Sequence, residues 1–125
     1  MLIKGRITQA GSPIIKVNLI GTKSQTMIEG ILDTGFDGYL CLPLTIAVPL
    51  GLELIDAADS ELADGTIVED EPVFAGKVEW NGEIMDVEIL LTKSSKVLIG
   101  TSLLKGTEVQ LNFSTSEVFI KGIEL

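Results

Sequence analysis

The chain has 125 residues, 46% of them hydrophobic and 5% aromatic, so we expect one domain with a core built mainly from Val, Ile and Leu. It has no histidine and a single cysteine, Cys41, which excludes Ser-His-Asp and Cys-His catalysis, His-ligated metals and internal disulfides. Nine basic residues are scattered among eighteen acidic ones, giving a net charge of −9, so nucleic acid is not an expected partner.

The first half of the chain predicts strands separated by turn residues, because β-branched and apolar residues dominate each segment. The expected strands are residues 2–9, 13–20, 25–32 and 39–42. The first two form a hairpin, and residues 33–38 form a loop. Pro43 suits the first turn of a short helix over residues 43–48, which Pro49 and Gly51 would end.

The second half predicts more strands, at residues 52–62, 66–80, 83–92, 97–99, 108–113 and 118–123. The first two are long arms around a turn at Ala63-Asp64-Gly65, and Asn81-Gly82 is the strongest hairpin signal in the chain. Thr101 or Ser102 would cap one helical turn that runs through residue 105.

These elements predict an all-β fold, either a barrel or a closed sandwich with one or two helical turns, in one domain over residues 1–125. Charged residues interrupt the first residues where a signal peptide would be apolar, and the longest uncharged run, residues 38–52, is shorter than a bilayer span. We therefore expect no membrane association. The single cysteine, in an apolar segment, fits a reducing, cytoplasmic location.

The segment most informative about chemistry is an apolar strand that delivers Asp33 onto the turn Asp33-Thr34-Gly35. A carboxylate held there becomes useful if a second carboxylate lies within hydrogen-bonding reach, because the pair then shares one proton and its pKa values separate. The ionised member can activate a water while the protonated member polarises a carbonyl. Asp-Thr-Gly is also an ordinary turn sequence, so the triplet by itself leaves both interpretations open.

The surroundings of the triplet resemble those of the retropepsin-like aspartic peptidases. The order apolar strand, Asp33-Thr34-Gly35, apolar strand is similar to their active-site loop, and residues 97–104 are similar to the segment that packs behind it. The tip Ala63-Asp64-Gly65-Thr66 lies where that family has its flap. Phe36 replaces the small residue usual in retroviral members, and residues 38–43 look more like those of bacterial and eukaryotic members.

The resemblance implies a closed barrel of the retropepsin (acid protease) type with a flap hairpin. It also implies an aspartic endopeptidase that hydrolyses peptide bonds of peptide or protein substrates without metal or cofactor. One chain holds one such loop, so activity would require a homodimer with Asp33 of each chain at its centre. The implied catalytic loop is Asp33, Thr34 and Gly35, with Thr34 bonding across to the partner loop. The implied substrate-binding residues are Phe36, Asp37, Asp64, Gly65, Thr66 and Ile99.

Two other hypotheses stay open. The chain could be a non-catalytic peptide-binding or scaffolding dimer that keeps this fold. It could also be an unrelated acidic β-barrel in which the triplet is accidental and the acidic residues between 56 and 71 bind calcium, although their spacing lacks an EF-hand pattern. Asp37 could contact substrate or be a solvated turn residue.

Overall fold

The structure, a computed structural model, describes residues 2–122 and is mostly β. Its strands are β1 (Leu2–Ile7), β2 (Pro13–Ile20), β3 (Gln25–Leu32), β4 (Leu40–Pro43), β5 (Glu53–Glu61), β6 (Ile67–Trp80), β7 (Glu83–Thr92), β8 (Leu98–Ile99), β9 (Thr107–Asn112) and β10 (Glu117–Gly122). Two short helices, α1 (Leu44–Leu50) and α2 (Thr101–Leu104), follow β4 and β8. The all-β class expected from the sequence is confirmed.

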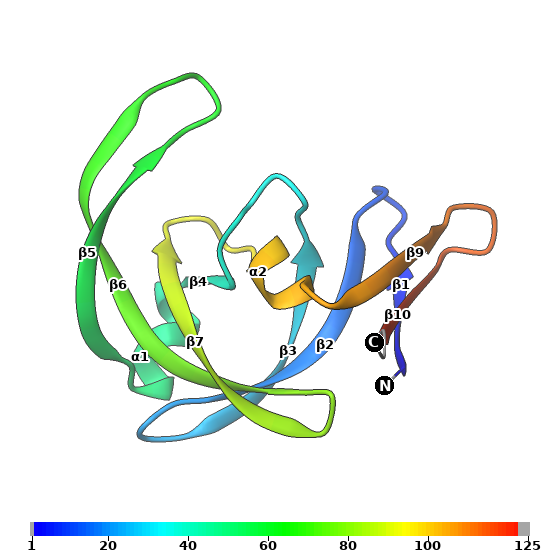
Figure 1. Ribbon diagram of the computed structural model, residues 1–125, viewed down its shortest axis with the longest axis horizontal. Coiled ribbons are helices and arrows are strands. Elements are labelled where there is room, and N and C mark those ends of the chain that lie inside the picture. The colour runs from blue at the N-terminus through cyan, green and yellow to red at the C-terminus, as the bar shows by residue number, and fades with distance from the viewer. Residues whose placement is uncertain (1, 123–125) are drawn as a thin grey trace.

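The strands form one sheet in the order β5-β6-β7-β4-β8-β3-β2-β1-β10-β9. An additional antiparallel pairing joins residues 18–20 of β2 to residues 77–79 of β6, so the sheet curls back on itself (Figure 1). The short strand β8 lies between β3, with which it is parallel, and β4, with which it is antiparallel. These pairings place the segment after β3 directly beside the segment after β8. Full closure of the barrel stays a prediction.

The core lies inside this curled part of the sheet. Along β2, Ile15, Val17 and Leu19 alternate with more exposed residues, because successive side chains of a strand point to opposite faces. They pack with fully buried residues of the central strands, such as Leu40 and Ile89, in one hydrophobic cluster. The sequence therefore orients each central strand by which of its faces is apolar.

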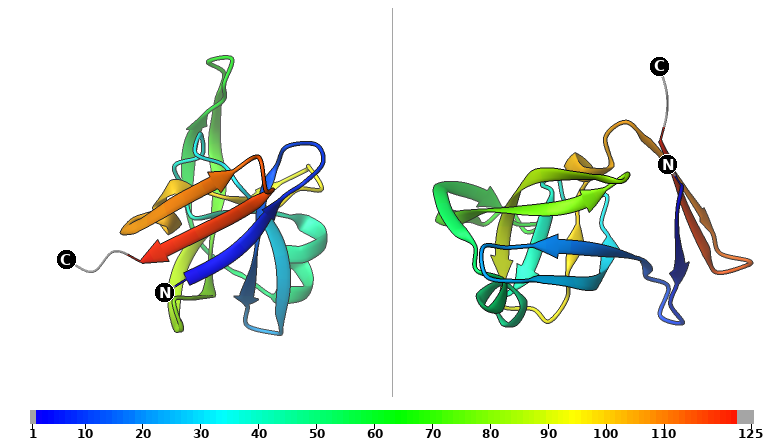
Figure 2. Two further views of the ribbon diagram at one scale, coloured as in Figure 1. Left: turned by 90° about the vertical axis from the view of Figure 1, so that its right-hand side faces the viewer. Right: turned by 90° about the horizontal axis from the view of Figure 1, so that it is seen from below.

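The terminal strands β1, β10 and β9 project from one end of the molecule as a three-stranded part of the same sheet, which we call the blade (Figure 2). β1 pairs with β10, and β10 pairs with β9, which ends the sheet. On one face, Val118 and Ile120 are buried, whereas on β9 and just after it Leu111 and Phe113 are 42% and 64% exposed. The apolar face of the blade thus extends beyond the core at its free edge.

The hairpin of β5 and β6 forms a long arm that rises from the body of the molecule (Figure 1). Its outer part is exposed on both strands and carries register irregularities near Asp56 and Ser60. Irregular pairing of this kind increases the twist of a hairpin. The arm has the position of the expected flap, and we call it the flap hairpin.

Most predicted strand boundaries are correct within two residues, and residue 123 of the last predicted strand lies outside the described residues. The first helix begins one residue later and ends two residues later than the predicted range of 43–48. Pro43 belongs to β4, and the helix continues through Pro49 to Leu50 because the amide of Gly51, at φ 72°, donates to the carbonyls of Ala47 and Val48. A glycine at a helix end adopts this positive φ without steric cost.

The capping prediction for α2 was wrong. Gly100, in extended conformation, precedes the helix, and no side chain caps its amides. Thr101 and Ser102 lie within the helix, and their hydroxyls face a distant loop, described below. No helix in residues 2–122 has both the length and the apolar character needed to cross a bilayer.

Candidate active site

Asp33 directly follows β3 and is fixed by its own backbone and side chain. Its amide donates to the Ile99 carbonyl at 2.9 Å, which ties the start of the loop to β8. Its carboxylate Oδ1 accepts the amide of Gly35 at 2.9 Å, and its carbonyl accepts the amide of Phe36 at 3.1 Å. The loop is therefore a tight turn that holds a half-buried carboxylate at a defined place beside solvent.

The short helix α2 supports the loop from behind. The amides of Thr101 and Ser102 donate to the carbonyls of Phe36 and Gly38 at 2.9 and 3.2 Å. The Ser102 hydroxyl donates to the carbonyl of Asp37 at 2.6 Å, and the Thr101 hydroxyl donates to the carbonyl of Phe36 at 3.4 Å. The loop carbonyls are thus satisfied by a segment 65 residues away, which fixes the loop without adding a charge near Asp33.

The ring of Phe36 packs over two glycines. A Cβ added to Gly38 would lie 2.6 Å from Phe36 Cζ, and one added to Gly100 would lie 2.8 Å from Phe36 Cδ2 and would also collide with the Gly38 carbonyl. Gly38 therefore makes room for the ring, and Gly100 makes room first for the backbone of Gly38 and then for the ring.

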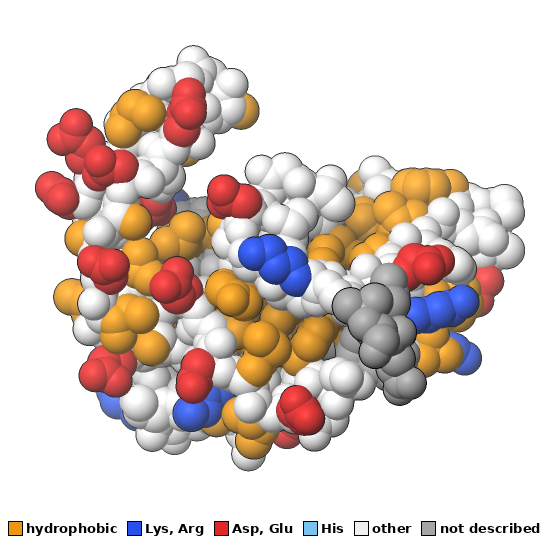
Figure 3. Space-filling model, viewed as in Figure 1, with side chains coloured by type: hydrophobic (Ala, Val, Ile, Leu, Met, Phe, Trp, Pro, Cys, Tyr) orange, Lys and Arg blue, Asp and Glu red, His pale blue; other side chains and the backbone are white. Residues whose placement is uncertain are grey.

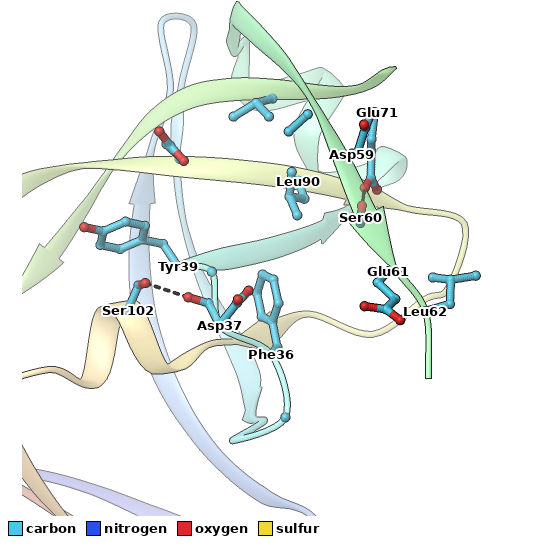
Figure 4. A pocket seen from close by; sticks show the side chains of 15 residues that line it. Phe36, Asp37, Tyr39, Asp59, Ser60, Glu61, Leu62, Glu71, Leu90 and Ser102 are labelled. Carbon is cyan, nitrogen blue, oxygen red and sulfur yellow. Dashed lines mark hydrogen bonds between the residues drawn. The ribbon is translucent and has the colours of Figure 1, made fainter. Parts of the chain in front are cut away.

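A cleft of about 740 Å³ separates the loop from the outer half of the flap hairpin, at residues 58–62, 71 and 73 (Figure 4). One wall is the loop from Gly35 to Tyr39 together with Ser102, and the other walls come from β5, β6 and β7. Figure 4 shows Phe36 and Asp37 on one side of the cleft, with Asp59, Ser60 and Glu71 on the other. Its lining residues are Gly35, Phe36, Asp37, Gly38, Tyr39, Ala58, Asp59, Ser60, Glu61, Leu62, Glu71, Val73, Glu88, Leu90 and Ser102.

The cleft combines apolar and acidic side chains. Phe36, Tyr39 and Leu90 are half-buried, and the carboxylate of Glu71, also half-buried, accepts a hydrogen bond from the Ser60 hydroxyl. Burial, followed by the negative charge of Glu71, raises the pKa of the Cys41 thiol. This thiol therefore stays protonated at neutral pH and does not behave as a nucleophile.

The flap tip is held by its own carboxylate. Asp64 Oδ1 accepts the amide of Thr66 at 2.9 Å across Gly65, whose φ is 86°. The Thr66 hydroxyl and then the Thr66 amide hold the pKa of the Asp64 carboxyl below its usual range. None of these three tip residues lines the cleft, which the flap hairpin borders only as far as Leu62.

The structure brings together some of the predicted site residues and separates others. Gly35, Phe36 and Asp37 line the cleft, with Asp33 and Thr34 directly before them in the same turn. Ile99 does not line it, because its side chain is fully buried in the core, where it lies against the position that a Cβ on Gly30 would occupy. The proposed role of Ile99 in substrate contact is corrected to packing beneath the loop.

Several lining residues had no distinctive signal in the sequence. Ser102 was expected to cap a helix, and Glu71 and Glu88 were indistinguishable from other acidic residues of their strands. Strand alternation could have placed Glu71 and Val73 on one face, since they are two residues apart in β6. Within residues 2–122, no three acidic or thiol side chains converge in a group that could hold a metal ion.

Comparisons with known proteins relate the chain to others through its fold. No family model and no curated protein sequence matches it. Among solved structures, a retropepsin-like aspartic protease from Rickettsia conorii superposes with a TM-score of 0.62 at 16% identity, covering 96% of this chain and 90% of that one. The EIAV protease, solved with an inhibitor, gives 0.61 at 17% identity, covering 78% and 89%. A foamy viral protease-reverse transcriptase gives 0.52 at 18% identity, with 90% of this chain matching 13% of that one. The fold is thus retropepsin-like.

Proposed function

We propose that this chain is an aspartic endopeptidase that hydrolyses peptide bonds as a homodimer. The observation that carries the proposal is the position of Asp33. This chain has a retropepsin-like fold, in which the half-buried carboxylate of Asp33 follows β3, accepts the Gly35 amide and directly precedes residues that line a cleft of about 740 Å³. The catalytic turn is Asp33, Thr34 and Gly35.

Two chains are needed because one chain supplies one such carboxylate. When two Asp33 side chains approach about a two-fold axis, electrostatic repulsion prevents both from ionising, so the pair holds one proton. The ionised carboxylate takes a proton from the attacking water, and the protonated one donates to the carbonyl oxygen of the substrate. Thr34, exposed in each loop, bonds across to the partner and keeps the two loops in register.

The free edge of the terminal blade supports the second copy. Val109 and Leu111 alternate with polar residues on the edge strand β9, and Phe113 continues the apolar face just beyond it. An edge strand with exposed apolar residues is suited to pair with another chain. We assign this surface, the β9 edge, to contact with the second protomer, because the active site is incomplete without that protomer.

The substrate would be an extended peptide bound along the cleft between loop and flap hairpin. Phe36 and Asp37 contact it from the loop, and Asp64, Gly65 and Thr66 reach it only if the flap hairpin closes on binding. Closure would bring the tip over the cleft and exclude water from the reacting carboxylates.

The test is cleavage of a mixed peptide library by the wild type, by Asp33→Asn and by the control Asp56→Asn, which changes a flap carboxylate outside the cleft. Cleavage by the wild type and the control, with none by Asp33→Asn, supports the proposal. Peptide binding without cleavage by any of the three, with dimers present, would favour a binding module instead.

A further inference from the structure

The cleft beside the catalytic loop carries a charge pattern that its proposed role does not require. Asp59, Glu61 and Glu71 face it from the flap hairpin, Asp37 from the loop, and Glu88 from β7. None of the 15 described lining residues is basic. Figure 3 shows the same trend on the surface, where acidic side chains gather along the flap hairpin.

These five carboxylates are not neutralised within the described chain. The ion pairs in residues 2–122 are Arg6 with Glu29 and Lys77 with Asp86, both outside the cleft. The partners recorded inside it are uncharged, namely the Ser60 hydroxyl on Glu71 and the Asp70 amide on Asp59. A cation entering the cleft is therefore attracted by carboxylates that have no cationic partner among the described residues, although no three of them converge on one point.

The apolar part of the lining adds a second requirement. Phe36, Tyr39, Val73 and Leu90 are buried or half-buried apolar side chains in the same lining as the carboxylates. A ligand that matches both kinds of lining residue has an apolar stem and a cationic end. Lys and Arg side chains have this construction, since their methylenes pack on apolar surface while the charged group reaches polar partners.

We infer that this cleft selects substrates with a Lys or Arg side chain at one position near the scissile bond, and that Glu71 is the principal selectivity residue. The inference rests on the proposed function for placing a peptide in the cleft. Glu71 is singled out because it is half-buried, whereas Asp37, Asp59, Glu61 and Glu88 are exposed and more strongly screened by salt.

The experiment uses uncharged peptides in which one Lys is moved from position to position, each matched by a peptide with norleucine, which keeps the four-carbon stem without the ammonium group. At one position the wild type should cleave the Lys peptide about fivefold better, as expected for a gain near 1 kcal/mol. Raising the salt from about 0.05 to about 0.5 M should lower this ratio, because added ions screen the attraction.

The variant Glu71→Gln keeps an acceptor for Ser60 and removes the charge, so the Lys-to-norleucine ratio should fall. Glu69→Gln, on the same strand but outside the cleft, is the matched control and should keep the wild-type ratio. Equal cleavage of both peptides at every position, or a ratio that does not respond to salt, would overturn the inference while leaving the peptidase proposal intact.

Absence of all cleavage would instead contradict the proposed function, and the selectivity is then judged by binding. Fluorescence anisotropy measures how tightly labelled Lys and norleucine peptides bind to the Asp33→Asn chain. This variant is used so that cleavage does not contribute to the signal. Tighter binding of the Lys peptide supports the inference for a peptide-binding module, and equal affinity overturns it.

Discussion

At the scale of single residues, the loop that carries Asp33 depends on the two glycines that lie against Phe36. The ring leaves no space for a side chain at Gly38, and at Gly100 a side chain would collide with the Gly38 carbonyl as well as with the ring. Gly100 has ordinary extended dihedrals, φ −95° and ψ 174°, so its requirement for glycine comes from contact and not from backbone strain.

Replacing Gly100 by Ala should therefore destabilise the protein through overpacking, by about 1–3 kcal/mol. Gly82→Ala is the matched comparison, since open space surrounds Gly82 and its φ of 74° leaves only a backbone cost of about 1–2 kcal/mol. Urea unfolding measures both. A Gly100→Ala loss that does not exceed that of Gly82→Ala, with catalytic activity retained, would show that the loop does not need this contact.

A second prediction at the residue scale concerns Asp64. Hydrogen bonds from Thr66 lower the pKa of its carboxyl, so the ionised form stabilises the flap tip at pH values above the pKa of an unfolded Asp, and this contribution is lost as the pH falls through the lowered pKa. Carboxyl NMR should give Asp64 a midpoint below the usual value of about 3.9. Thr66→Ala removes the hydroxyl and should raise that midpoint. An unchanged midpoint would contradict the assigned cause.

At the scale of elements, the link between α2 and the loop is the main structural device of the site. Ser102→Ala removes the bond from its hydroxyl to the Asp37 carbonyl. Ser24→Ala is a matched control, because it removes a similar bond to the Pro49 carbonyl far from the cleft. Each change should cost about 1 kcal/mol of stability. Only Ser102→Ala should lower kcat/KM, by about tenfold, and equal kcat/KM for both variants would contradict the link.

The contacts between elements also explain why the strands could be predicted from the sequence, whereas part of the site could not. Apolar alternation in β2 and the turn at Asn81-Gly82 are local signals, so most strand boundaries were predictable. The hydroxyl of Ser102 suggested a local cap, but its partner is a loop 65 residues away, and no local pattern encodes such a contact. Ile99 was expected to contact substrate because the family resemblance implied it, and no local pattern showed that its side chain is buried. Its burial is set by two neighbouring strands, one parallel and one antiparallel.

At the scale of the whole molecule, the blade formed by β1, β10 and β9 ends in an apolar edge. Phe113→Asp places a charge on that edge and should shift the protein from dimer to monomer in analytical ultracentrifugation, with loss of peptidase activity. Met27→Asp is the control, because Met27 is 61% exposed but lies on β3, away from the β9 edge. A Phe113→Asp chain that remains a dimer would assign the interface to another surface.

The central claim is that one active site uses Asp33 from two chains, and mixed dimers test it most directly. Wild-type and Asp33→Asn chains are unfolded together in equal amounts in urea and refolded, so that protomers pair at random. If both carboxylates are required, only dimers of two wild-type chains are active, and activity should be about one quarter of that of the same total concentration of wild type. Activity of about one half would mean that each chain works with its own Asp33, and it would contradict the shared site.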